Sequence, residues 1–257
     1  RWGRRAAQIR AVMGKLQADV VCLQEAEVEL PTEDYGLHPG CYGFVVGRRP
    51  AGRSDGCIIA WRLDRFNLLR ESVVSFDDYL SPSTAGEDAR FRTGHTAAIA
   101  QLQPHGSDRS LLVVTAHLVW GEFSEDIRQW QLQVLQSAVE KFDSSCVVFC
   151  GDFNSLPGGQ VHKYLSSMYC SAYEGLEASV VTNTNAAAGD GFAETIDYCW
   201  LLRDGDAHLR RRIRLPTRDA LRSMLGGAPA PAPVPTLVAA GLWPSDHLPV
   251  GVDVALP

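Results

Sequence analysis

The sequence contains no apolar run long enough to cross a membrane. No apolar stretch follows the basic N-terminal segment RWGRRAAQIR, as a secretory signal would require. It has no CxxC pair, so neither a zinc ribbon nor a thioredoxin-type motif is supported. The phosphate-binding patterns GxxxxGKS/T and GxGxxG are also missing, which argues against nucleotide-driven and dinucleotide-dependent enzymes. We therefore expect an intracellular protein, cytoplasmic or nuclear, with no membrane partner.

The composition is that of an ordinary globular protein. With 257 residues, of which 46% are hydrophobic and 21% charged, the chain is long enough for a well-buried core, and we expect a single domain over 1–257. The net charge of -6 neither favours nor excludes a nucleic-acid substrate, because metal ions can hold phosphates without a basic surface. Most of the seven cysteines lie in apolar segments, which indicates buried, reduced thiols.

Short apolar runs and a few helical patterns follow one another along the chain, which predicts many strands with helices between them. Helical spacing of apolar residues marks 4–17 and 124–142, and Ser124 is the expected N-cap of the second helix. Strands are expected in the apolar segment that ends at Glu25 and at 55–62, 95–103, 110–118, 194–202 and 209–215.

Several of these predicted strands carry a polar group at or beside an end. Asp152 and Asn154, for example, directly follow the apolar run CVVFC. An isolated DxN is most simply a turn, because both side chains bond to nearby backbone. Asp197 is harder to explain in this way, since we expect it inside an apolar strand, where a charge must be paired or coordinated. The full set is Glu25, His117, Asp152, Asn154, Asp197, Asp246 and His247.

If these strand ends meet at one rim, they form a cluster of hard oxygen ligands with two histidines. Such ligands suit Mg²⁺ or Mn²⁺, which bind through few carboxylates and leave positions open for substrate phosphates. Carboxylates and histidines beside the metal can activate water and neutralise charge on a phosphoryl group. No histidine and cysteine spacing points to zinc.

Five motifs carry a family resemblance. They are CLQEAE, VVTAHLVWGEFSEDIRQWQ, GDFNSLPGGQVHKYL, TIDYCWL and PSDHLPV. In this order they resemble the endonuclease/exonuclease/phosphatase superfamily, and most of all its branch of carbon-catabolite-repression-type deadenylases, Angel proteins and nocturnin. The resemblance extends from about residue 2 to 254 and implies an α+β fold of the DNase I type. That fold is a two-layer β-sandwich flanked by helices, with the active site at one rim.

The resemblance also implies roles for individual residues. The metal ligands would be Glu25, Asp152 and Asp246. Asn154 would position the attacking water and the phosphate, and Arg128 and His95 would contact substrate. His117 would stabilise the charge that develops on phosphorus, and His247 would contact the phosphate. The catalytic set implied in this way is His117, Asp152, Asn154, Asp197, Asp246 and His247.

Two departures from the family pattern affect these expectations. The family has a first strand with a metal-site Asn before its first helix, whereas this sequence starts at that helix. We therefore expect a fold without its first N-terminal strand, from either an incomplete or an impaired chain. His95 stands where deadenylase relatives commonly carry Asn in a substrate contact. It either alters base recognition or is a satisfied histidine at the edge of the sheet.

The expected activity is that of a Mg²⁺-dependent 3′-to-5′ exoribonuclease that acts on the poly(A) 3′ end of RNA and releases AMP. One alternative is a nocturnin-like nucleotide phosphatase or a 2′-5′ oligoadenylate phosphodiesterase, and another is a non-catalytic binding protein on the same fold. We expect Trp120, Phe123 and Trp130 to pack in the core, with base stacking as the alternative. The arginines in 210–214 are expected on a solvated strand face rather than along a phosphate path.

Overall fold

The computed structural model describes residues 2–50, 52–80, 89–122, 124–184, 192–224 and 243–256. Helices and strands occupy most of the segments expected from the sequence. The helices are α1 (Trp2–Leu16), α2 (Glu125–Val139), α3 (Gln160–Met168) and α4 (Arg218–Met224). The strands are β1 (Val20–Glu27), β2 (Tyr42–Arg48), β3 (Asp55–Arg62), β4 (Phe66–Ser75), β5 (Thr96–Pro104), β6 (Leu111–His117), β7 (Val147–Asp152), β8 (Tyr169–Ser171), β9 (Asp197–Leu202), β10 (His208–Arg212) and β11 (Val252–Ala255).

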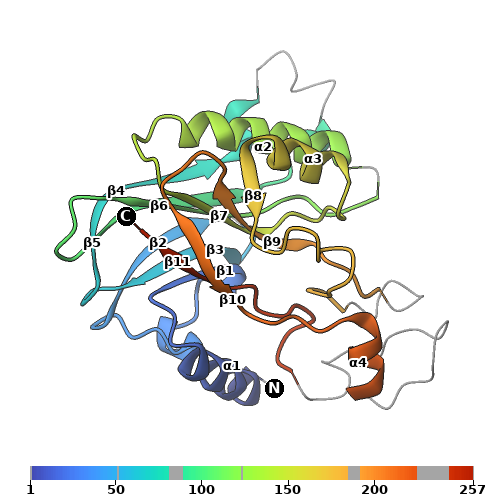
Figure 1. The fold of residues 1–257 in the computed structure, drawn as a ribbon, viewed down its shortest axis with the longest axis horizontal. Helices are drawn as coiled ribbons and strands as arrows, with labels where there is room; N and C mark the ends of the chain where they lie inside the picture. The colour runs from blue at the N-terminus through green and yellow to red at the C-terminus, as the bar shows by residue number, and fades with distance from the viewer. Residues whose placement is uncertain are drawn as a thin grey trace.

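Two sheets stack face to face, and a small strand pair lies beside them. The larger sheet has the order β4-β5-β6-β7-β9-β8, and the smaller has the order β1-β3-β2. Strands β10 and β11 form an antiparallel pair of their own. In the large sheet β6 and β7 are parallel, while the other neighbours are antiparallel. A parallel pair needs a long crossover, and α2 provides it here (Figure 1).

Alternation of side chains along the strands explains the four layers of the fold. In β3, Ile59 and Trp61 face the large sheet, whereas Ile58 and Ala60 pack with residues of α1. On the other face of the large sheet, Leu132 and Leu135 of α2 and Leu165 of α3 cover the core. Figure 1 shows α1 on one side of the sheets and α2 with α3 on the opposite side. The predicted sandwich flanked by helices is confirmed.

Ser124 is the N-cap residue of α2, as expected, although its side chain makes no capping hydrogen bond. Two other local expectations were wrong. Asp197 lies at the first position of β9 rather than inside the strand, so it belongs to the rim of the sheet. Trp130 packs against Phe91 and the core, as expected, but Trp120 is 75% exposed. Phe123 lies outside the described residues.

Expectations on the surface and the thiols are confirmed in part. All seven cysteines are free, and Cys57, Cys146 and Cys199 are buried, but Cys22 and Cys150 are only partly buried. The side chains of β10 are exposed along the whole strand. Within the described part of the chain, no helix is long and apolar enough to span a bilayer.

Candidate active site

Three neighbouring strands of the large sheet deliver polar side chains to one rim. His117 ends β6 and is the register partner of Asp152, which ends β7. Asp152 is in turn the register partner of Asp197, which begins β9. Because β6 and β7 are parallel and β9 is antiparallel to them, the three residues form a row across the sheet. The predicted meeting of these strand ends is therefore observed.

The centre of this row is a buried pair of carboxylates. Asp152 is 5% exposed, and Asp197 is also buried. Burial raises the pKa of Asp152 well above its usual range, and the neighbouring Asp197 carboxylate raises it further. Two acids this close favour either a shared proton or a bound cation. Ligand atoms of Asp152, Asp197 and His247 all lie within 4.8 Å of one another.

His247 reaches this rim from the segment that precedes β11. Its Nδ1 lies 3.0 and 2.9 Å from the two carboxylate oxygens of Asp197, and its Nε2 lies 3.8 Å from Oδ2 of Asp152. Burial alone would lower the pKa of this imidazole, but the Asp197 carboxylate outweighs burial and raises the pKa to about 10. In the metal-free protein His247 is therefore a cation at neutral pH, held in place by Asp197.

Asn183 is a site residue that the sequence reasoning missed. Its side-chain nitrogen lies 2.7 Å from Nε2 of His247, and an isolated bridge joins the backbones of the two residues. The Oδ1 atom of Asn183 is buried and has no partner in the described structure. A charged His247 donates from both ring nitrogens, so the amide must present its oxygen to Nε2 in that state. The surrounding sequence, VVTNTN, gave no signal beyond a polar turn.

Glu25 faces the same rim from the smaller sheet. It adopts a left-handed backbone conformation (φ 50°) at a register shift between Leu23 and Ala26 in the β1–β3 pair. Such a conformation is unfavourable for glutamate, and a bulge of this kind re-aims a side chain. The side chain is 68% exposed, and Oε1 lies 3.8 Å from Nδ1 of His117. Its carboxylate makes no hydrogen bond to any residue in the described ranges.

His117 lies between the carboxylates of the two sheets. Its Nδ1 faces Glu25, and its Nε2 lies 3.5 Å from Oδ2 of Asp152. Burial lowers the pKa of His117, and this effect exceeds the opposing influence of Glu25. The imidazole is therefore neutral at pH 7 and can accept a proton or donate a hydrogen bond.

Asn154 is held by its neighbours in a fixed position. It also has a left-handed backbone (φ 47°), and its amide N–H donates to Oδ1 of Asp152 at 2.8 Å. Its side-chain nitrogen donates to the carbonyl of Leu118, also at 2.8 Å. The side-chain oxygen is therefore the group that Asn154 can offer to a ligand. Asp152 therefore has two roles, because the same carboxylate belongs to the site and also accepts the backbone hydrogen bond of the turn that positions Asn154.

The remaining sequence candidates lie around this centre. His95 is buried beside His117, with ring centroids 5.6 Å apart. The Arg128 guanidinium donates to Glu125 and to the carbonyls of Val119 and Gly121. Its predicted substrate contact therefore stays a prediction. The backbone carbonyl of Asp246 accepts from the N–H of Thr184 at 2.7 Å, and Asp246 adjoins the cluster through His247.

The donor set fits a hard divalent cation. Asp152 and Asp197 offer carboxylate oxygens at the centre, His247 offers an imidazole nitrogen, and the Glu25 carboxylate lies nearby. Carboxylate oxygens are the donors that Mg²⁺ and Mn²⁺ prefer. The predicted ligand roles of Glu25 and Asp246 remain predictions, because neither belongs to the three-residue cluster found in the described chain.

Asp197→Asn is expected to lower the pKa of His247 from about 10 by roughly two units or more, because the main charge that opposes burial is removed. An NMR titration of the imidazole in EDTA measures this. The pKa of His247 is higher in the folded than in the unfolded protein. The contribution of the His247–Asp197 pair to the free energy of unfolding is therefore fully present below pH 6.5 and is lost as the pH rises through about 10. The matched control is Asp253→Asn, at an exposed carboxylate of β11 away from His247. An unchanged His247 pKa in Asp197→Asn would refute the pairing.

A family model for the endonuclease/exonuclease/phosphatase family matches residues 1–247. The chain is 30% identical to mouse protein angel homolog 2 over 195 residues, which is 70% of this chain and 34% of that protein. It is 27% identical to carbon catabolite repressor protein 4 homolog 6 of Arabidopsis thaliana over 174 residues, 64% of this chain and 23% of that protein. The chain thus spans about a third or less of the length of these relatives.

Solved structures share the fold at lower identity. The human nocturnin catalytic domain with bound sulfate superposes with a TM-score of 0.72 and 22% identity, over 100% of this chain and 88% of that one. ANGEL2, described as a 2′,3′-cyclic phosphatase, superposes in complex with adenosine-2′,3′-vanadate with a TM-score of 0.74 and 21% identity. That match covers 99% of this chain and 86% of the ANGEL2 chain.

Proposed function

The chain belongs to the endonuclease/exonuclease/phosphatase family, and we propose that it is a metal-dependent exoribonuclease that removes AMP from the 3′ end of single-stranded RNA, with a preference for poly(A). The observation that carries this proposal is the row of His117, Asp152 and Asp197, completed by His247. The family description, which names nucleases and phosphatases, supports the choice of a phosphate ester as substrate.

Each side chain at the rim has a separate role in the proposed reaction. Water attacks the 3′-terminal phosphodiester, the bond from phosphorus to the preceding O3′ breaks, and the products are 5′-AMP and an RNA with a free 3′ hydroxyl. Asp152, buried at the centre of the row, would accept a proton from the water. The His247 cation, fixed by Asp197, would stabilise negative charge on the phosphoryl oxygens.

Asp152 and Asp197 would hold Mg²⁺ or Mn²⁺, with Glu25 beside them. The bound ion would supply Lewis-acid polarisation of the phosphoryl group and a more acidic water. His117 is neutral and lies between Glu25 and Asp152, so it can donate a hydrogen bond to a phosphate oxygen without repelling the cation.

The test is incubation of the protein with a 5′-labelled oligoadenylate and Mg²⁺, with and without EDTA. We expect a ladder that shortens from the 3′ end, releases AMP and disappears in EDTA. An oligocytidylate of the same length tests base preference. Cleavage that persists in EDTA, or internal cuts in place of a 3′ ladder, would contradict the proposal. The absence of any cleavage would favour the non-catalytic alternative.

A second candidate is removal of a terminal phosphate. It is favoured by the similarity to ANGEL2, which is described as a 2′,3′-cyclic phosphatase. In place of cleaving the 3′-terminal diester, the same rim would open a cyclic phosphate at the RNA end with one water and hydrolyse the resulting monoester with a second. An oligoadenylate that ends in a 2′,3′-cyclic phosphate separates the two activities, because phosphate is released without shortening of the chain.

A further inference from the structure

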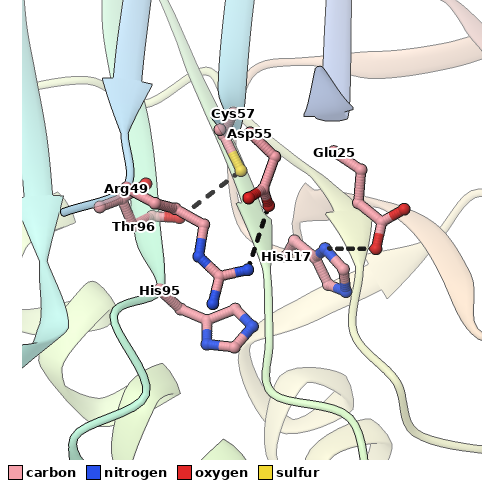
Figure 2. Close-up of a pocket in the computed structure, with 8 residues that line it drawn as sticks. Glu25, Arg49, Asp55, Cys57, His95, Thr96 and His117 are labelled. Atoms are coloured by element: carbon pink, nitrogen blue, oxygen red, sulfur yellow. Dashed lines mark hydrogen bonds and ion pairs between the residues drawn. The ribbon is translucent and has the colours of Figure 1, made fainter. Parts of the chain in front are cut away.

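A cavity of about 530 Å³ opens beside Glu25 and His117. Its far wall is formed by three arginines, His95 and the exposed indole of Trp120. A narrower pocket adjoins it, and Figure 2 shows the Arg49 guanidinium and the imidazoles of His95 and His117 close together there. The proposed mechanism uses Glu25 and His117 and leaves the rest of this cavity unassigned.

The three arginines are not equivalent. Arg49 donates to the carbonyls of Thr93 and Gly94 and pairs with Asp55, so it is fully engaged in joining two loops. Arg53 and Arg92 are exposed and line the same cavity, and no ion pair or side-chain hydrogen bond joins either guanidinium to a residue in the described ranges. Two exposed guanidiniums beside the proposed phosphoryl-transfer site are suited to bind a phosphate.

His95 provides an unused hydrogen-bonding group at the inner end of the cavity. It is 6% exposed, and its Nδ1 is buried without a partner among the described residues. Burial, followed by the charge of Arg49, lowers the pKa of this imidazole to about 3, so the ring is neutral. An unpaired polar atom in such a place is costly unless a ligand satisfies it. The expectation of a satisfied histidine at the sheet edge is therefore wrong for Nδ1.

Trp120 is exposed but held on a fixed loop. Arg128 donates to the carbonyls of Val119 and Gly121, on either side of the tryptophan. Gln131 accepts from the N–H of Val119 and donates to Thr93, which lies on the opposite wall. An exposed indole on a preorganised loop can stack on a flat ligand at little entropic cost.

We propose that this cavity is a nucleotide subsite of single-stranded nucleic acid, in which Trp120 stacks on a base, Arg53 and Arg92 hold a phosphate that is not cleaved, and His95 hydrogen-bonds to the base or its sugar. The inference rests on the proposed function, because it places the subsite next to the scissile phosphate. It adds that the substrate carries at least two phosphates. Arg128 and Gln131 are positioning residues in this arrangement.

Binding can be measured apart from catalysis. We would follow the fluorescence anisotropy of a labelled tetra-adenylate in EDTA, which stops metal-dependent cleavage. Trp120→Ala is expected to weaken binding roughly tenfold. The double variant Arg53→Gln/Arg92→Gln is expected to lower the slope of log Kd against log salt by about 0.7 to 1.4, which corresponds to one or two lost phosphate contacts. Trp120→Ala leaves that slope unchanged.

Three further comparisons sharpen the result. Arg211→Gln removes an arginine that is 84% exposed on β10 and lies outside the cavity, and it is expected to bind as the parent protein does. A tetranucleotide with abasic sugars is expected to bind equally to Trp120→Ala and the parent, because only stacking is lost. Trp120→Phe is expected to retain part of the affinity.

The outcomes separate this inference from the proposed function. Tight oligonucleotide binding that depends on Trp120, without hydrolysis in Mg²⁺, would support the subsite and overturn the exonuclease. Hydrolysis with Kd and salt slope unchanged in Trp120→Ala and in the double variant would support the exonuclease and overturn the subsite. Equal loss of affinity for the intact and the abasic ligand in Trp120→Ala would also overturn the stacking role.

Discussion

Replacing Asp152 by asparagine is expected to lower kcat for RNA hydrolysis by at least about 10³-fold while the fold is retained. Asparagine has nearly the same shape, and its side-chain oxygen can still accept the N–H of Asn154. It cannot accept a proton from water or provide an anionic oxygen for a cation. The loss would therefore fall on kcat, measured with the labelled oligoadenylate, rather than on folding.

The same variant gives a second signature through stability. In the metal-free protein, Asp152 is buried beside Asp197, and its pKa is raised. Its ionised form therefore opposes folding as the pH rises above the usual range of a carboxyl group. Asp152→Asn is expected to have a Tm equal to or above the parent value at neutral pH in EDTA. Mg²⁺ is expected to raise the Tm of the parent but not that of the variant.

Asp64→Asn is the matched control, because Asp64 is an exposed carboxylate that pairs with Arg62 away from the rim. It should keep both the activity and the response of Tm to Mg²⁺. Activity of Asp152→Asn within tenfold of the parent would exclude Asp152 as the central catalytic group. A loss of activity with a large fall in Tm would show that the variant had unfolded. The location of the active site at this rim would then be tested with His247→Gln.

Gly151→Ala is expected to destabilise the protein by more than about 4 kcal/mol. Gly151 has a positive φ of 151°, and a Cβ atom there would lie 2.0 Å from the carbonyl oxygen of Ala116. Ala116 is the register partner of Gly151 in the parallel β6–β7 pair, so the clash is with backbone that cannot turn aside. Urea unfolding measures the effect, and recovery of the variant only as insoluble protein would agree with it.

Gly158→Ala serves as the control for backbone conformation alone. Gly158 also has a positive φ, 79°, but a Cβ there would meet nothing within 4 Å. It is expected to cost roughly 1 kcal/mol, the usual penalty of a left-handed residue. If Gly151→Ala were no more destabilising than Gly158→Ala, the result would contradict the close contact between the backbones of β6 and β7 at Gly151.

The apolar runs located most strands, and the polar residues at their ends located the rim. These features are local, because a buried run that stops at Asp152 or His117 is visible without knowledge of the fold. The family resemblance then supplied the sandwich, which alternation along single strands could not define. Asp197 was placed on the right strand but not at its first position, because the ends of strands are set by pairing with neighbours.

The features that the sequence did not reveal depend on long-range geometry. Asn183 contacts His247 across 64 residues, and no local pattern distinguishes it from an ordinary turn residue. The left-handed backbone of Glu25 arises from a bulge against β3, which a reading of β1 alone cannot predict. Trp120 was expected in the core because large aromatics usually bury apolar area, and its exposure follows from the loop that Arg128 fixes.

The parallel pairing of β6 with β7 has a consequence for how the proposed activity arises as the protein folds. Strands β4, β5 and β6 follow one another as antiparallel neighbours and can form from contacts close in sequence. Asp152 joins His117 only after the chain has closed a loop that includes α2, and such closures are slow compared with hairpin formation. Asp197 and His247 arrive from still later segments. Catalysis during refolding is therefore expected only when the whole tertiary structure is complete. Helix or strand content that is recovered early in refolding would not be accompanied by activity.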